Sequence, residues 1–115
     1  MTENVIDTAT FVALKEMAGA EFIAELIDTF LSEAPRIMAD LQKGLADNDT
    51  ELFRRSAHSL KSNSNTFGAL TLGSLAKDLE YMGRDNQLAG VGDKLEMLTA
   101  EYAKVESAMK GLRDE

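Results

Sequence analysis

The sequence predicts an all-α protein, an antiparallel up-down four-helix bundle with a short additional helix at the N-terminus. Three observations support this fold class. Apolar residues recur every three or four positions along five stretches, no stretch alternates with period two over the length of a strand, and β-branched residues are sparse. The connections between the stretches are short, which favours antiparallel packing of consecutive helices.

The first two helices are expected over residues 5–18 and 20–47. Gly19 separates them, because glycine commonly ends a helix. The second helix keeps its apolar period almost throughout, although Pro35, the only proline in the chain, lies inside it. Proline removes a backbone donor and crowds the preceding turn, so we expect this helix to kink or restart there.

The third helix is expected over residues 54–69 and is opened by the turn at residues 48–51. Its small and apolar residues are spaced four, three, four and three, and therefore share one side of the helix. They are Phe53, Ala57, Leu60, Ser64 and Phe67. The neighbouring face carries Arg54, His58, Lys61, Ser62 and Asn65. The only histidine of the chain is thus predicted to lie in the middle of an exposed face, with a basic residue about one turn away on either side.

The last two helices are expected over residues 72–82, closed by Gly83 and the loop at 84–86, and over residues 88–112. The final helix carries the most regular apolar seam in the chain. Such a seam either pairs with a second copy as a coiled coil or packs inside its own domain. Three other one-sided helices in the same chain favour internal packing, and hence a monomer, over a homodimeric scaffold.

Length and composition indicate a single helical domain over residues 1–115. Of these residues, 44% are hydrophobic, which is enough for a core that folds without metal or disulfide. The chain has no cysteine, which excludes disulfides and thiol chemistry and fits a reducing compartment. We see no signal peptide and no apolar run of the roughly 20 residues that cross a bilayer, so we expect a cytoplasmic protein without membrane insertion.

The charge balance and the missing motifs exclude several function classes. A formal net charge of −8 argues against nucleic acid and anionic membrane as main partners. Neither GxxxxGK[ST] nor GxGxxG is present, so no ATP site of a kinase is recognisable. One histidine without any cysteine makes a poor metal site, and Ser59 and Ser62 beside His58 lack the third group of a hydrolytic triad.

The chemistry that remains is the imidazole of His58 acting as a nucleophile. A neutral imidazole has a lone pair that can attack phosphorus and hold the phosphoryl group as a phosphoramidate. Lys61, one turn further on, is suited to offset the charge of that group, and the small side chain of Ser62 leaves space for a bulky partner. On spacing alone, a structural histidine without chemistry is the more common case.

Residues 57–64, AHSLKSNS, followed by Gly68 and Ala69, closely resemble the signature of histidine-containing phosphotransfer (HPt) domains, roughly AHxLKGxxxxxGA. Residues 21–35 and 72–84 resemble the helices that precede and follow this signature, so the resemblance covers nearly the whole chain. One departure is Ser62, where the family often has glycine. A second is Glu80, where some members carry glutamine.

The resemblance implies a bacterial phosphorelay protein that takes a phosphoryl group from an aspartate of a receiver domain and passes it to another receiver. It makes His58 the phosphoacceptor, gives Lys61 the offset of phosphate charge, and has Gly68 shape the end of the helix. Expected partners are response-regulator receiver domains, a hybrid histidine kinase, or both. The chain would bind no cofactor or metal, since the receiver brings Mg²⁺. Arg54 and Arg55 either help to dock the receiver or belong to the plain surface.

The residues matched on the following helix suggest how the imidazole is oriented. Our hypothesis is that Glu80 accepts a hydrogen bond from one ring nitrogen and frees the other as the nucleophile. The alternatives are a solvated glutamate or an ion pair with Lys77 or Arg84. Arg84 is either part of the binding surface or a cation that complements the helix dipole, and Asn65 is expected at the rim.

A second functional interpretation is a helical docking module that regulates a receiver or a kinase without being phosphorylated. A helical bundle hosts many functions, so the fold does not separate the two. The intact His58 and Lys61 favour phosphotransfer. Neither the donor and acceptor nor the direction of transfer can be predicted from this chain.

Overall fold

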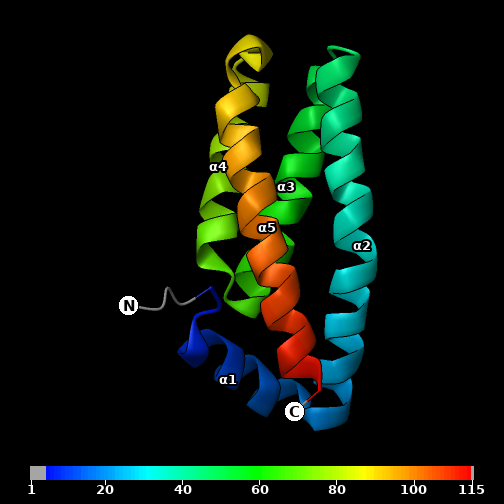
Figure 1. Ribbon diagram of the computed structural model, residues 1–115, viewed down its shortest axis with the longest axis vertical. Helices are drawn as coiled ribbons and strands as arrows, with labels where there is room; N and C mark the ends of the chain where they lie inside the picture. The colour runs from blue at the N-terminus through cyan, green and yellow to red at the C-terminus, as the bar shows by residue number, and fades with distance from the viewer. Residues whose placement is uncertain (1–4, 115) are drawn as a thin grey trace.

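The computed structural model describes residues 5–114. It consists of the helices α1 (Thr8–Ala18), α2 (Ala20–Ala46), α3 (Thr50–Phe67), α4 (Leu70–Arg84) and α5 (Gly92–Arg113), with the short 3₁₀ turn η1 (Leu88–Gly90) before α5. Helices α2 to α5 run alternately up and down as a bundle, and α1 lies across the end at which α5 finishes (Figure 1). The predicted all-α bundle with a short N-terminal helix is confirmed.

The core is built from the apolar stripes that the sequence predicts. All five positions of the α3 stripe are buried, and Phe53, Ala57, Leu60 and Ser64 are completely inaccessible. Near the α1 end, the rings of Phe30 on α2 and Phe67 on α3 meet edge to face with centroids 5.4 Å apart. Because this stripe turns one side of α3 inward, the opposite side of the helix must face solvent.

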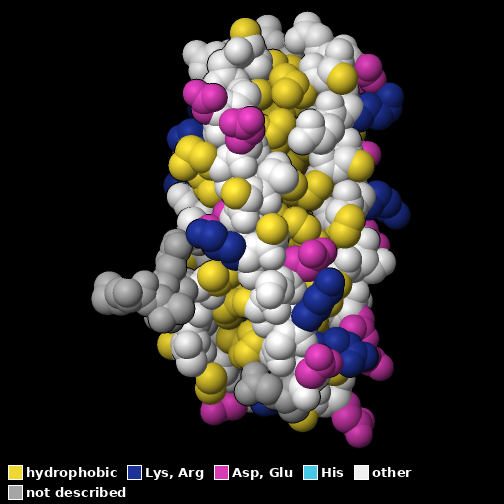
Figure 2. Space-filling model, viewed as in Figure 1, with side chains coloured by type: hydrophobic (Ala, Val, Ile, Leu, Met, Phe, Trp, Pro, Cys, Tyr) yellow, Lys and Arg dark blue, Asp and Glu magenta, His cyan; other side chains and the backbone are white. Residues whose placement is uncertain are grey.

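The seam of the last helix packs inside the domain, as predicted, from Leu88 through Met109. The start of the last helix differs from the prediction. Helix α5 starts at Gly92, and the residues before it form the 3₁₀ turn η1. The two glycines at 90 and 92 explain this difference, because glycine weakens a continuous α-helix. Apolar side chains along α5 and its neighbours are visible in Figure 2, which shows a face of the molecule without a visible histidine.

We expected a kink or a restart at Pro35, and the restart does not occur, because helix α2 runs through the proline without a break. The side chains of Phe30, Ala34 and Leu41 are buried on both sides of the proline and hold both halves of the helix on one core. Pro35 itself is exposed. Tertiary packing thus outweighs the loss of one backbone hydrogen bond.

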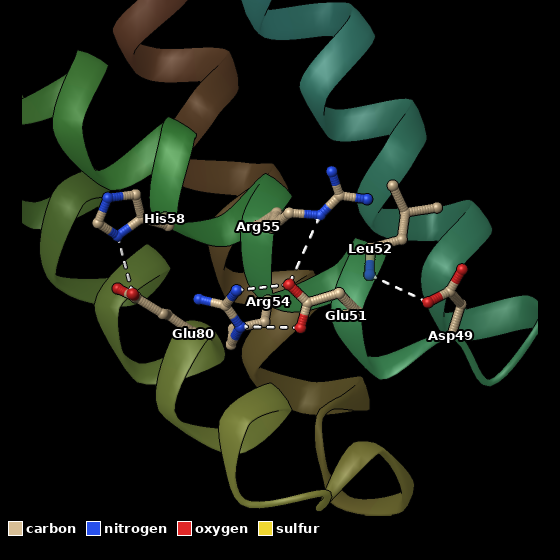
Figure 3. A network of polar contacts seen from close by, with 7 residues as sticks. All are labelled: Asp49, Glu51, Leu52, Arg54, Arg55, His58 and Glu80. Carbon is tan, nitrogen blue, oxygen red and sulfur yellow. Dashed lines mark hydrogen bonds and ion pairs between the residues drawn. The ribbon is translucent and has the colours of Figure 1, made fainter.

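Both ends of α3 are fixed by specific residues. At its start the carboxylate of Asp49 accepts a hydrogen bond from the Leu52 amide at 3.1 Å (Figure 3). At its end Gly68 has φ +89°, a left-handed conformation that ends the helix. The Asp7 amide donates to the Gly68 carbonyl at 2.7 Å, which ties the N-terminal segment to this point.

Among residues 5–114, no helix has the length and apolar character needed to cross a bilayer.

Candidate functional site

His58 lies near the middle of α3, on the side opposite the buried stripe. Its neighbours Ala57 and Leu60 are fully buried, whereas 54% of the His58 side chain is exposed. The helical period of the sequence is therefore sufficient to bring the ring to the surface. The end of α3 at Gly68 lies about 15 Å further along the helix, at 1.5 Å per residue.

Glu80 of α4 bridges two residues of α3. Its Oε2 atom lies 2.8 Å from Nδ1 of His58, as Figure 3 shows, and its Oε1 atom lies 2.7 Å from Nζ of Lys61. Only 12% of the Glu80 side chain is exposed. The contact that we hypothesised between Glu80 and the imidazole is present, and one carboxylate also holds the lysine.

The Glu80 carboxylate is stabilised in its ionised form despite its environment. Burial raises the pKa of Glu80, but hydrogen bonds from Lys61 and then from His58 outweigh burial and bring the pKa below its usual value. Glu80 is therefore an acceptor at neutral pH.

An ionised carboxylate fixes the protonation of the ring nitrogen that faces it. Because the carboxylate can only accept, Nδ1 of His58 must carry a proton, and the lone pair of a neutral ring then resides on Nε2. Figure 3 shows this second nitrogen pointing away from Glu80. No residue between 5 and 114 forms a hydrogen bond with it. The arrangement presents an exposed, nucleophilic nitrogen.

Lys61 differs from its sequence-based description. We expected an exposed lysine, but only 23% of its side chain is exposed, and its ammonium group is paired with Glu80. The reason is that α4 packs beside this face of α3 and brings a carboxylate within reach. The charge of Lys61 is therefore held in a defined place beside the ring rather than left mobile in solvent.

A groove opens on the other side of His58, between α2 and α3. It has a volume of about 460 Å³, and its lining includes Arg36 and Ile37 from α2 and Arg55, His58 and Ser62 from α3. The helical spacing of Ser62 after His58 predicted that the two residues share a face. The α2 wall was not identified, because the sequence does not reveal which helix lies beside α3.

Three residues grouped with the site in the sequence form no hydrogen bond or ion pair with His58, Lys61 or Glu80 in the described part of the chain. Gly68 is buried at the far end of α3, where it accepts the hydrogen bond from Asp7. Asn65 lies on the surface of α3 toward α4. Arg84 binds Asp85 at the end of α4 and covers the Tyr81 ring, with 4.6 Å between the guanidinium carbon and the ring centroid.

The structure thus locates these residues without testing their roles, which stay predictions. It unites His58, Lys61 and Glu80 and places Ser62 beside them. Arg54 and Arg55 both approach Glu51, at 2.6 and 3.8 Å, so each has a partner on its own helix (Figure 3). In the part of the chain from 5 to 114, no group of three His, Cys, Asp or Glu residues could hold a metal ion.

Comparisons with known proteins agree with this geometry. A sequence profile of the Hpt domain matches residues 25–108, and the chain belongs to this family. Histidine-containing phosphotransfer protein B of Pseudomonas aeruginosa is similar in structure, with 27% identity, a TM-score of 0.91 and coverage of 98% of this chain and 97% of that one. A comparison with curated protein sequences gives no significant match.

A second solved structure shares the fold. The Hpt domain of a hybrid sensor histidine kinase from Shewanella has a TM-score of 0.79 and 20% identity, covering 94% of this chain and 92% of that one. Hpt domains are phosphotransfer modules and not kinases, and they interact with receiver domains and hybrid kinases. The chain is accordingly a phosphorelay intermediate of two-component signalling.

Proposed function

We propose that Nε2 of His58 accepts a phosphoryl group from the aspartyl phosphate of a receiver domain and passes it to the aspartate of another receiver. The observation that carries this assignment is the 2.8 Å contact between Nδ1 and Glu80, combined with a ring that is 54% exposed. One nitrogen is held by the protein, and the other is left for a partner.

The phosphoryl transfer requires no cofactor bound to this chain. The Nε2 lone pair forms a bond to phosphorus while the bond between phosphorus and the aspartate oxygen breaks, and the carboxylate leaves with the electron pair. The proton on Nδ1 stays in place, so the phosphorylated ring carries positive charge. The ionised Glu80 carboxylate stabilises that charge, and the reverse sequence returns the phosphoryl group to an aspartate.

Lys61 and Ser62 have supporting roles in this proposal. The Lys61 ammonium lies on the same carboxylate as the ring and can offset the charge of the phosphoryl oxygens. Ser62 is exposed and lines the groove beside His58, where its small side chain keeps the approach open. The receiver supplies Mg²⁺ with its own acidic pocket, and the chain itself binds no metal in this scheme.

The receiver is proposed to dock over the groove between α2 and α3. The groove is lined by two arginines, Arg36 and Arg55, and by two carboxylates, Glu33 and Asp40, so its charges can pair with charges of both signs on the receiver. The contact should be modest in area and short-lived, because a relay intermediate must release each partner.

Since the seam of α5 is buried, we propose that the chain acts as a monomer. Light scattering at low and high protein concentration tests this, and a mass that doubles would contradict it.

The direct test of the proposal uses a receiver domain phosphorylated by acetyl phosphate in the presence of Mg²⁺. Label should move to this chain and should be stable in base and labile in acid. His58→Gln should abolish labelling while the circular dichroism spectrum stays helical. Label that persists in this variant would contradict the assignment of His58. If the wild type binds the receiver without taking label, the chain is a docking module instead.

A further inference from the structure

Two glycines of α4 lie against α3, one before and one after Glu80 in the sequence. Both are buried. A Cβ atom on Gly73 would lie 2.0 Å from Oδ1 of Asn65. A Cβ atom on Gly83 would lie 3.1 Å from Cδ1 of Phe53 and 3.3 Å from the backbone N and Cα of Arg54. Carbon atoms normally approach to about 3.5–4.0 Å, so a methyl group at either site requires its neighbours to move, by a few tenths of an ångström at Gly83 and by more at Gly73.

The two close contacts differ in what can move. Asn65 is exposed, and its amide is the end of a flexible side chain that can turn into solvent. Phe53 is fully buried, and the contacted atoms of Arg54 belong to the backbone of α3. Because a packed core yields little, we expect a methyl group on Gly83 to shift α4 from α3 by a few tenths of an ångström. A methyl group on Gly73 displaces only the amide.

The Gly83 contact lies directly beside the site. Gly83 is one helical turn after Glu80, and Arg54 is one turn before His58, so this close approach of the two helices lies one turn from the ion pairs. Glu80 holds two partners at once, at 2.8 and 2.7 Å. A single side chain can follow one partner when the helices separate, but it cannot easily follow both.

We infer that Gly83 is a positioning residue: its missing side chain lets α4 lie close enough to α3 for one carboxylate to hold both His58 and Lys61. Glycine is needed here for space and not for backbone conformation, since neither Gly83 nor Gly73 has a positive φ. The inference deepens the proposed function, because it rests on the role of Glu80 in fixing the ring tautomer.

A matched pair of variants tests this inference in the isolated protein. Gly83→Ala and Gly73→Ala make the same change in the same helix, and helix propensity favours alanine in both. His58 is the only histidine, so ¹⁵N-histidine labelling reports a single ring. Glu80→Ala provides the reference spectrum of the ring without its carboxylate.

At neutral pH, Gly83→Ala should shift the two ring ¹⁵N resonances toward the Glu80→Ala spectrum, as the Nε2–H tautomer gains population. Gly73→Ala should keep the wild-type spectrum. An unchanged ring in Gly83→Ala, or an equal shift in Gly73→Ala, would overturn the inference. If Gly83→Ala fails to fold, the same comparison is made in a Phe53→Leu background, where the methyl group meets mainly the Arg54 backbone.

These outcomes are separate from those of the proposed function. The ring spectra require no receiver, so a wild-type protein that takes no label would contradict the phosphotransfer proposal and leave the positioning role of Gly83 intact. Conversely, a protein that takes label normally while Gly83→Ala shows wild-type ring resonances would remove only the role of Gly83.

Discussion

The two sides of α3 that flank His58 are built differently. On the α4 side the helices lie so close that a Cβ on Gly83 would come within 3.3 Å of the Arg54 backbone, and a largely buried carboxylate joins Lys61 to the ring. On the α2 side a groove of about 460 Å³ opens between the two helices. The closed side fixes the orientation and proton of the imidazole. The open side leaves its surroundings accessible to another protein.

The electrostatics of the two sides differ in the same way. The ion pair between Glu80 and Lys61 is mostly buried, so water screens it weakly. In the groove, Arg36 and Arg55 lie 3.9 and 3.8 Å from glutamates of their own helices, and both arginines are largely exposed. Such pairs contribute little and exchange easily. The open side can therefore rearrange its charged side chains around a partner, while the closed side keeps its geometry.

The largest effect is expected when the closed side loses its acceptor. Glu80→Ala should slow phosphotransfer by about 10–100-fold, because a hydrogen bond to a charged group contributes about 1.5–3 kcal/mol. Single-turnover transfer from a phosphorylated receiver measures this. Glu80→Gln is the matched control, since its amide oxygen can still accept from Nδ1. Equal losses in both variants would mean that charge, and not ring orientation, is the contribution of Glu80.

Blocking the open side should weaken docking without disturbing the ring. Ser62→Trp places a large side chain in the groove and should raise the receiver concentration for half-maximal transfer about tenfold, or about 1.4 kcal/mol. Ser62→Gly should transfer like the wild type. The ¹⁵N ring spectrum of both variants should be unchanged. A receiver that binds Ser62→Trp with full affinity would place docking on another face.

Removing the cation of the closed side should have a smaller effect. Lys61→Ala should slow transfer about three- to tenfold, because one charge near the phosphoryl group is lost at a partly solvated site. Lys61→Arg keeps the charge and should recover most of the rate. If Lys61→Ala transfers at the wild-type rate, its only role is to hold Glu80.

The smallest expected effect is on stability. The pKa of Glu80 is lowered in the folded protein, so its carboxylate stabilises the fold above the unfolded-state pKa of about 4.3, and this gain is lost as pH falls through the lower folded pKa. Wild type should melt about 3–5 °C above Glu80→Gln at pH 7. The difference should shrink in melts recorded below about pH 4. A difference that grows in acid would contradict the sign.

The sequence predicts which face of α3 is exposed better than it predicts the contacts of α3 with α2 and α4. Helical period alone places Phe53 inside and His58 outside, because both depend only on local geometry. The shielding of Lys61 and the α2 wall of the groove depend on which helices lie beside α3. Period within one helix does not contain that information. The hypothesis for Glu80 depends on the resemblance to a known family, because the spacing within one helix does not predict it.

Two glycines also show that contacts between helices cannot be predicted from the sequence of one helix. Gly68 and Gly83 both look like helix-ending residues in the sequence. Gly68 does end α3, with a positive φ that favours glycine. Gly83 is the next-to-last residue of α4, and it also lies against α3, where a Cβ would be only 3.3 Å from the backbone of Arg54. A close approach between helices has no local signal that distinguishes it from a terminus.

The central claim is that Glu80 holds a proton on Nδ1 and leaves Nε2 as the phosphoacceptor. NMR of the ¹⁵N-histidine protein, before and after phosphorylation by a receiver domain, tests it most directly. We predict Nδ1–H in the free ring and ³¹P–¹⁵N coupling to Nε2 in the phosphorylated one. A free ring protonated mainly at Nε2, or phosphorus bonded to Nδ1, would contradict the account.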